Sequence, residues 1–182
     1  ETGSPVALAA ACDAGSGEGY GGAALRRMAS FACGVELDAV ACRHAATTYP
    51  HVPVVRANLI ALPLRDGSFD LVSSMQVIEH MWDVPGYLAE LTRILAPGGD
   101  LVVSTPNRPV CSPGLRRGGR PLNPFHVEEF DAEQVRALLR RAGLVDIEVH
   151  GLVHGPWTGS GSMVPWCPHS SAASPVTPRP PG

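Results

Sequence analysis

A cluster of glycines directly after an apolar run constrains how this chain can begin to fold. The apolar run reads PVALAAAC, and the stretch CDAGSGEGYGG that starts at its last residue holds five glycines in eleven positions. Glycine inside a regular element costs roughly 0.5–1 kcal/mol relative to alanine, so a cluster is favoured only for a special reason. Either the backbone takes positive φ angles here, or another group approaches it closely.

Apolar runs alternate with segments of helical periodicity along the next part of the chain, which predicts βαβ units and a parallel sheet. Strands are expected over residues 6–12, 31–37, 52–57, 69–74, 101–105 and 145–149.

Two helices are predicted most clearly. The segment DVPGYLAELTRILAPGG has Asp83 as a cap and an apolar face, and it should end at the Pro-Gly-Gly of residues 97–99. That face is expected to comprise Leu88, Leu91, Ile94 and Leu95. The segment DAEQVRALLRRAG has capping-box spacing between Asp131 and Gln134.

The last part of the chain has a different composition. Residues 155–182 are rich in Pro, Ser and Gly and show no periodicity, which is typical of a linker or a disordered tail. We therefore expect one folded domain over residues 1–154, followed by a low-complexity tail over residues 155–182. The opening ETGS is unlike a natural start.

Composition excludes several classes of function. The net charge of −3 and the scattered arginines favour neither a nucleic-acid partner nor an anionic membrane surface, and no run of 18 apolar residues is present. The five cysteines are odd in number and form no C-x-x-C pair. This argues against a disulfide scaffold or a zinc site and favours a cytoplasmic location. Arginine supplies all 14 basic residues, which indicates a GC-rich, bacterial coding sequence.

The glycine cluster is part of a longer pattern. Its spacing is D-x-G-x-G-x-G, and Glu36 in the motif GVELD follows Gly19 by 17 residues, at the end of the next expected strand. A carboxylate in that position can accept hydrogen bonds from both hydroxyls of a ribose. A glycine pattern alone is weak evidence, and the second landmark strengthens it.

These motifs, followed by NLIALPLRDGSFDLVSSMQVIEHM and ILAPGGDLVVSTPNR, occur in a characteristic order over residues 6–150. The chain thereby resembles the class I S-adenosylmethionine (SAM)-dependent methyltransferases, in particular the small-molecule group called type 11. The resemblance implies a Rossmann-like, doubly wound, mostly parallel α/β sheet with helices on both faces and an antiparallel last strand. It also implies SAM as the cofactor, bound by Asp13, Gly15, Gly17, Gly19, Glu36, Leu37, Asn58, Leu59 and Gln76.

Within that set, the resemblance implies a division of roles. The aspartate and glycines of the first turn would surround the methionine part of SAM, and Glu36 would hold the ribose. Asn58 stands where an aspartate usually contacts the adenine amino group, and Leu59 would lie beside the adenine ring. SAM has a carboxylate but no phosphate, so backbone N–H groups at a helix N-terminus suit it.

Methyl transfer to a hydroxyl needs alignment of three atoms and a base that removes a proton. In similar O-methyltransferases the histidine of QVIEHMWD is a frequent candidate, so His80 is predicted to be the general base; the alternative is packing against the cofactor. Glu79 and Asp83 could orient His80 or help to bind Mg²⁺, which we treat as optional, with no metal ligands assigned.

The segment PLNPFHVEEF is a second candidate region. It holds Asn123, Phe125, His126 and Glu129, and His126 is predicted either to act in catalysis or to pack. The preceding long loop carries Arg116, Arg117 and Arg120, which form either a lid over a polar or anionic acceptor or a solvated loop. The segments STPNRP and NPFHVEEF resemble those of a subset of bacterial methyltransferases. This resemblance implies a hydroxyl on a small molecule or a saccharide as the methyl acceptor.

Three alternatives stay open. The chain could be a C- or N-methyltransferase. It could also be an incomplete or non-catalytic SAM-fold protein, because neither the helices that usually precede the first strand nor the closing β-hairpin is visible. A dehydrogenase is disfavoured by the presence of DGSFDLV followed by LAPGG. The sequence does not indicate an oligomeric state.

Overall fold

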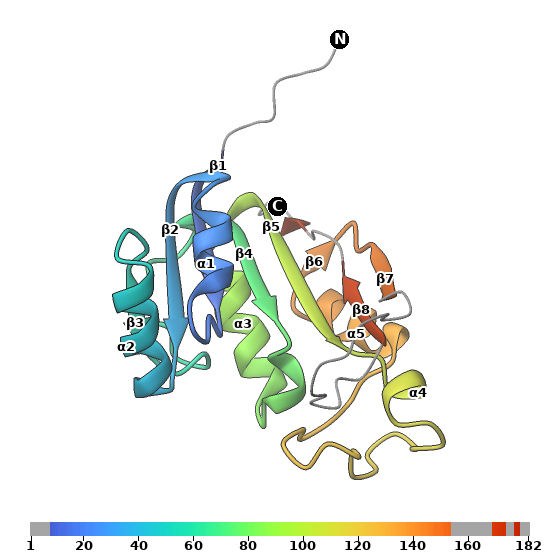
Figure 1. The fold of residues 1–182 in the computed structure, drawn as a ribbon. Coiled ribbons are helices and arrows are strands. Elements are labelled where there is room, and N and C mark those ends of the chain that lie inside the picture. Colours follow the sequence, from blue (N-terminus) through green and yellow to red (C-terminus); the bar gives the residue numbers. More distant parts are fainter. Residues whose placement is uncertain (1–7, 154–168, 174–176, 179–182) are drawn as a thin grey trace.

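Five parallel strands form the centre of the structure (Figure 1). The computed structural model describes residues 8–153, 169–173 and 177–178. The strands are β1 (Leu8–Ala14), β2 (Ala29–Glu36), β3 (Val54–Arg56), β4 (Phe69–Met75) and β5 (Leu95–Pro106). They lie in the order β3-β2-β1-β4-β5, so the chain moves outward in one direction from β1 and then in the other from β4. Ligands bind beyond the carboxyl ends of the strands at such a switch point.

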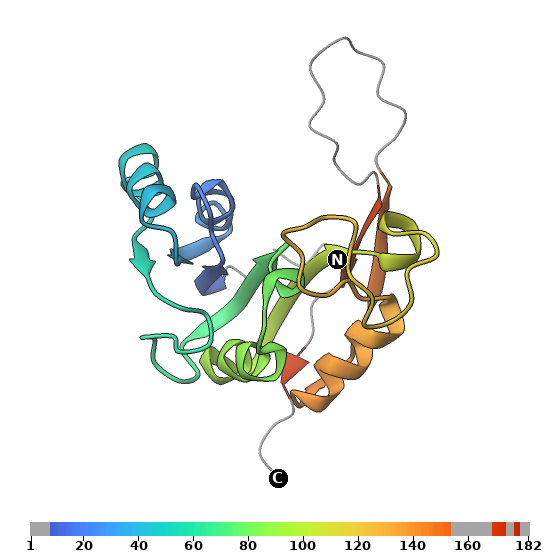
Figure 2. The same cartoon turned by 90° about the horizontal axis from the view of Figure 1, so that it is seen from below.

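Helices cover both faces of this sheet (Figure 2). One face carries α1 (Tyr20–Leu25) and α2 (Ala39–Thr48), and the other carries α3 (Val84–Ile94) and α5 (Ala132–Arg141). A short 3₁₀ turn, η1 (Ile78–His80), follows β4, and α4 (Arg108–Cys111) follows β5. This arrangement confirms the predicted Rossmann-like, doubly wound fold.

The sheet continues on the far side of β5 with two more strands. There β8 (His169–Ala173) pairs antiparallel with both β5 and β7 (Val149–Val153), which confirms the antiparallel strand that the resemblance implied. The structure thus contains a closing strand pair that is not visible in the sequence, and residues 169–173 and 177–178 of the expected low-complexity tail form strands. The letters HSSAA show no hydrophobic alternation, so the backbone pairing with β5 and β7 makes this segment a strand.

The sixth predicted strand, over residues 145–149, is divided. It separates into β6 (Leu144–Val145), which pairs with β9 (Thr177–Pro178), and β7. Asp146 has a φ of 52°, and this left-handed residue interrupts the extended backbone.

Both clearly predicted helices are present. The Asp83 side chain accepts a hydrogen bond from the Gly86 N–H at the start of α3, and α5 begins with the predicted capping box. However, α3 ends at Ile94, and Leu95 already belongs to β5. The Pro-Gly-Gly stretch therefore lies inside the start of β5, beside an irregular register with β4.

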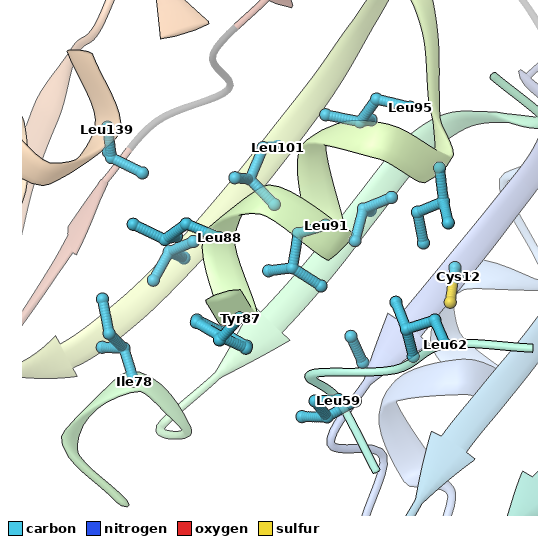
Figure 3. Packing of buried hydrophobic residues seen from close by; sticks show 14 of the residues in the cluster. Cys12, Leu59, Leu62, Ile78, Tyr87, Leu88, Leu91, Leu95, Leu101 and Leu139 are labelled. Atoms are coloured by element: carbon cyan, nitrogen blue, oxygen red, sulfur yellow. The ribbon is translucent and has the colours of Figure 1, made fainter. Parts of the chain in front are cut away.

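Helix α3 supplies much of the hydrophobic core (Figure 3). Tyr87, Leu88 and Leu91 are buried against the sheet, and a side chain of this size contributes about 1.5–3 kcal/mol when fully buried. The Tyr87 hydroxyl donates to Ser74 Oγ at 2.6 Å, and Ser74 donates to the carbonyl of Ala14 at 2.7 Å. This chain of bonds joins α3 to the carboxyl ends of β4 and β1.

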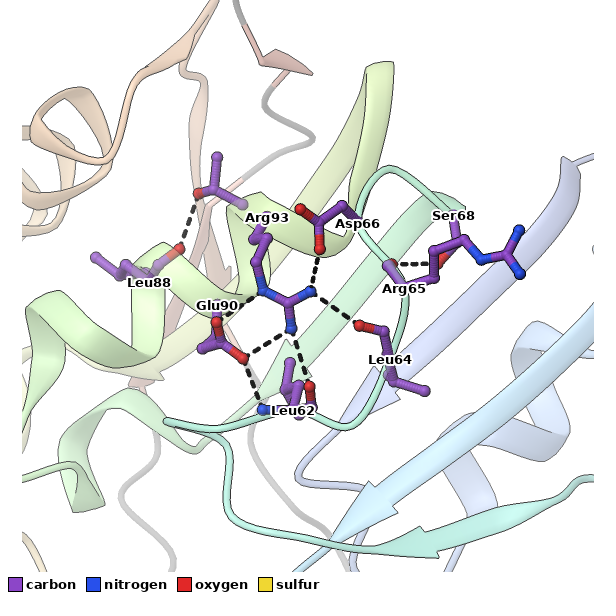
Figure 4. A network of polar contacts seen from close by, with 9 residues as sticks. Leu62, Leu64, Arg65, Asp66, Ser68, Leu88, Glu90 and Arg93 are labelled. Carbon is purple, nitrogen blue, oxygen red and sulfur yellow. Dashed lines mark hydrogen bonds and ion pairs between the residues drawn. The ribbon is translucent and has the colours of Figure 1, made fainter.

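Arg93 fixes the segment between β3 and β4 (Figure 4). Its guanidinium donates to the Glu90 and Asp66 carboxylates and to the carbonyls of Leu62 and Leu64. Glu90 in turn accepts from the backbone N–H of Leu62 at 2.6 Å. The network anchors on α3 the same segment that carries Asn58 and Leu59.

The cysteines differ in part from expectation. Cys12, Cys33 and Cys42 are buried free thiols, as a reduced protein would have, but Cys111 is disulfide-bonded. A single disulfide leaves no local spacing signature, because the fold decides which cysteines come together. In the part of the chain that the structure describes, no helix is both long and apolar enough to cross a membrane.

Candidate active site

The glycine turn joins β1 to α1 at the carboxyl edge of the sheet. Gly15, Gly17 and Gly19 have φ angles of 83°, 50° and 93°, which are left-handed values that favour glycine. The N–H groups of Gly15 and Ser16 both donate to the carbonyl of Val35. The turn is thus held against the end of β2, and positive φ accounts for the glycines that the sequence singled out.

Close approach is the second reason for these glycines, and it differs between positions. A Cβ on Gly15 would lie 2.5 Å from Val77 Cγ2, and one on Gly19 would lie 2.8 Å from the Cβ of Ala45. Gly17 has no atom within 4 Å of that position. Gly15 and Gly19 are therefore packed against the protein itself, whereas Gly17 leaves open space where a ligand could approach the backbone.

Asp13 lies behind this turn. Its buried carboxylate accepts from Ser73 Oγ at 3.0 Å and from the Gly22 N–H. Burial raises the pKa of Asp13, and the two hydrogen bonds partly oppose that shift. This residue braces the first turn of α1 against β4, and its predicted contact with the cofactor stays a prediction.

Glu36 is held rigidly at the end of β2. One carboxylate oxygen accepts from the Gly17 N–H at 2.9 Å, and the other accepts from the N–H groups of Leu37 and Asp38 at 2.7 and 2.8 Å. A carboxylate has about four acceptor sites, so capacity for a ligand hydroxyl remains. The bond from Gly17 ties the glycine turn to Glu36, the residue predicted to hold a ribose, and the other two fix its carboxylate at the end of β2.

A cavity of about 470 Å³ opens beside these residues, which is within the size range of small-molecule sites. Its walls bring together seven of the predicted residues: Gly15, Glu36, Leu37, Asn58, Leu59, Gln76 and His80. The carboxylate of Glu36 and the amide of Asn58 are its polar groups at one side, and apolar side chains form much of the rest. This donor set suits a molecule with a ribose and a flat nitrogen-bearing ring.

The cavity also contains residues that the sequence reasoning missed. Val77, Met81 and Trp82 follow β4 and complete its wall together with Ile60. Val77, Met81 and Trp82 are apolar residues of the QVIEHMWD motif itself, so their closeness to His80 in the sequence was the signal that could have identified them. Gln76 has a φ of 58° and donates from Nε2 to Ser104 Oγ at 3.1 Å, so its amide is already engaged with β5.

His80 lies at the carboxyl edge, where the structure leaves its side chain exposed. Its Nδ1 lies 2.9 Å from the carbonyl oxygen of Phe125, and a carbonyl can only accept, so this nitrogen carries the proton in the neutral ring. Nε2 is then the nitrogen with a free lone pair. The fold thus selects Nε2 as the nitrogen that can accept a proton.

Glu79 is buried beside His80, with 1% of its surface exposed. Its Oε2 accepts from Thr105 Oγ1 at 3.0 Å, and its backbone carbonyl accepts from the Val127 N–H at 2.7 Å. Burial raises the pKa of Glu79, while its own N–H, the Thr105 hydroxyl and the two nearby histidines lower it in part. Glu79 therefore joins η1 to the loop that carries Phe125 and His126.

His126 is brought next to His80, with ring centroids 5.1 Å apart in a T-shaped arrangement. Its Nδ1 lies 2.8 Å from Glu129 Oε1, and its Nε2 lies 2.9 Å from the Asn123 side-chain nitrogen. Both ring nitrogens are therefore engaged, unlike those of His80. This geometry favours a structural role for His126 over proton transfer, and its catalytic role stays a prediction.

A second cavity of about 510 Å³ adjoins the first. His80 and Trp82 line both cavities, and Arg120, Phe125 and His126 line the second. His80 thus stands between a space suited to a cofactor and a space suited to an acceptor.

Donor atoms of Glu79, His80 and His126 lie within 4.8 Å of one another and could hold a metal ion. Asp83, which the sequence placed in an optional Mg²⁺ site, is instead engaged as the cap of α3. Among the described residues, His126 takes its place in the group, because the loop after β5 folds back over η1.

Replacing Glu79 by glutamine is expected to stabilise the protein at neutral pH. Burial raises the pKa of Glu79 above its usual 4.5, so the stability contributed by proton binding is complete below about pH 4.5 and is lost as pH rises through the higher folded value. Glutamine carries no charge and avoids that loss. Urea unfolding in EDTA should give a gain at pH 7 that shrinks toward pH 4.5. The exposed Glu18→Gln variant is the control, and an equal effect at both pH values would contradict the explanation.

Comparison with known proteins agrees with this geometry. Residues 12–103 match the family model described as a methyltransferase domain. A probable SAM-dependent methyltransferase of Mycobacterium tuberculosis is 45% identical over 144 residues, which are 79% of this chain and 52% of that protein. A ubiquinone biosynthesis O-methyltransferase of Xanthomonas euvesicatoria is 33% identical over 99 residues, covering 50% of this chain and 41% of the relative.

The fold has a solved counterpart in a SAM-dependent methyltransferase from Mesorhizobium loti. Its TM-score is 0.68 at 21% identity, and the match covers 93% of this chain and 90% of that one. The chain spans about half the length of the M. tuberculosis relative. The family match covers half of the chain, over β1 to β5 and the walls of the first cavity, and the chain therefore belongs to the class I SAM-dependent methyltransferases.

Proposed function

We propose that this protein transfers the methyl group of SAM to a hydroxyl of a small molecule or a saccharide. The observation that carries the proposal is the position of His80. It lies in the wall shared by two cavities, and the Phe125 carbonyl leaves its Nε2 free to take a proton.

The residues of the first cavity fit SAM. When bound, SAM supplies an electrophilic methyl group on a positively charged sulfur. Glu36 would accept from a ribose hydroxyl with its remaining acceptor site, and Asn58 and Leu59 would receive the adenine. The open backbone at Gly17 lets the amino-acid end approach without a side chain in the way.

The reaction requires a deprotonated acceptor. His80 Nε2 would take the proton of the acceptor hydroxyl, and the oxygen would then displace S-adenosylhomocysteine (SAH) from the methyl carbon of SAM. Glu79 and His126 hold His80 and its loop in place. Support for an oxygen acceptor comes from the O-methyltransferase relative. A C- or N-methyltransferase remains the alternative, and an amine acceptor would need less proton removal.

A second role is possible for Glu79, His80 and His126, because their donor atoms lie within 4.8 Å of one another. In this form Glu79, His80 and His126 would hold a divalent cation, which would lower the pKa of the acceptor hydroxyl in place of the base. The cytoplasmic location, the bacterial origin, the lack of nucleic-acid and membrane partners and the domain boundary at residue 154 stay predictions of the sequence.

The Glu36→Ala variant tests the cofactor site. SAH at about 100 times its dissociation constant stabilises a folded protein by about 2.7 kcal/mol, a thermal shift of roughly 5–10 °C at this size. We expect this shift in the wild-type chain and in the exposed control Glu148→Ala, and its loss in Glu36→Ala. A cooperatively folded wild-type chain without the shift would favour a non-catalytic member of the family.

A further inference from the structure

The first part of the loop between α4 and α5 carries several positive charges. Residues 112–127 contain three arginines and no acidic residue, although the whole chain has a net charge of −3; Glu128, Glu129 and Asp131 follow at the end of the loop. Arg116, Arg117 and Arg120 are exposed and have no ion pair within the described ranges.

Arg120 brings this charge to the second cavity. The ionisable side chains that line this cavity are Arg120, His80 and His126, and no carboxylate lines it. The first cavity differs in this respect, because Glu36 and Asp83 line it. The carboxylates near the two histidines, Glu129 and Glu79, are buried. Among the described residues, Arg120 is therefore the exposed charged group at the second cavity, and an exposed cation attracts anions.

Two aromatic side chains complete the second cavity. Trp82 is 89% exposed and Phe125 is 79% exposed. Large aromatic groups exposed at a cavity can receive the flat face of a ring, with the edge of the ligand left in water. The same cavity thus offers an apolar platform beside a cationic group.

We propose that the methyl acceptor is an acidic, ring-bearing molecule with a carboxylate or phosphate. Its anionic group is bound by Arg120, whose guanidinium matches the geometry of both anions. Its ring lies against Trp82 and Phe125, and its hydroxyl reaches His80. This inference rests on the proposed function and adds the charge class of the acceptor. Arg116 and Arg117 contribute to the field of the loop without being required contacts.

Matched probes test the charge class on the full chain. SAH binding is measured first, by calorimetry. SAH-saturated protein is then titrated with 3,4-dihydroxybenzoate against 3,4-dihydroxybenzyl alcohol, and with glucose 6-phosphate against glucose. The first pair tests a carboxylate and the second a phosphate, each with a ring and hydroxyls. The variants are Arg120→Gln and, as an exposed arginine elsewhere on the surface, Arg65→Gln.

We expect the anionic member of at least one pair to bind roughly tenfold more tightly than its neutral partner. Added salt should reduce this preference, Arg120→Gln should abolish it, and Arg65→Gln should retain it. Equal affinity within both pairs, no binding of any probe to SAH-bound protein, or a preference that survives Arg120→Gln would each overturn the inference. Failure to bind SAH would instead count against the proposed function.

Discussion

Replacement of His80 by glutamine is expected to lower kcat for methyl transfer to a hydroxyl by roughly 10²- to 10⁴-fold, the range that general bases contribute. Glutamine keeps a polar side chain at η1 but cannot take up a proton. Steady-state kinetics of the variant and the wild-type chain at one pH measures this loss.

Two controls separate a base from a structural role. His80 is exposed, so the variant should unfold within a few degrees of the wild type and should bind SAH; the exposed His51→Gln variant should retain full activity. Retention of activity in His80→Gln would eliminate the base. If instead EDTA abolishes wild-type activity and Mg²⁺ restores it, with weaker Mg²⁺ binding in the variant, the cation role replaces the base.

Replacement of Gly15 by alanine is expected to destabilise the fold by roughly 2–5 kcal/mol. The left-handed backbone costs an alanine about 1–2 kcal/mol, and overpacking in a tight site costs about 1–3 kcal/mol. The clash is with Val77 Cγ2, 2.5 Å from the new Cβ, and a β-branched side chain has little freedom to rotate away. Urea unfolding of the single variant measures the total.

A double-mutant cycle with Val77→Ala separates the two costs. The second substitution removes the clashing methyl groups, so the overpacking cost of about 1–3 kcal/mol should be recovered, and the backbone cost should remain. Gly17→Ala is the matched control, because its Cβ would meet no atom within 4 Å. It should show only the backbone cost, together with weaker SAH binding. A cycle without coupling would show that Val77 does not restrict the turn.

Local sequence patterns were sufficient for the elements that depend on local chemistry. The helix caps at Asp83 and Asp131 and the alternation of strands and helices are read from neighbouring residues, and the structure confirms them. The position of the cofactor cavity could also be predicted from the sequence, because the carboxyl ends of β1, β2 and β4 meet at one edge of a parallel sheet. Residues that follow those strands, such as Gly15, Glu36 and His80, therefore line one cavity.

The sequence by itself determined the order of the elements and the chemistry available at the sheet edge. Tertiary structure alone decided which atoms meet. It brings residues 169–173 into backbone pairing with β5 and places the Phe125 carbonyl where it selects the tautomer of His80. It also places His126, and not Asp83, in the group with Glu79 and His80, and it brings Val77 close to Gly15. The physical reason is the range of the interactions. Caps and periodicity act over a few residues, whereas these contacts join segments distant in sequence and exist only after the loops fold over the sheet.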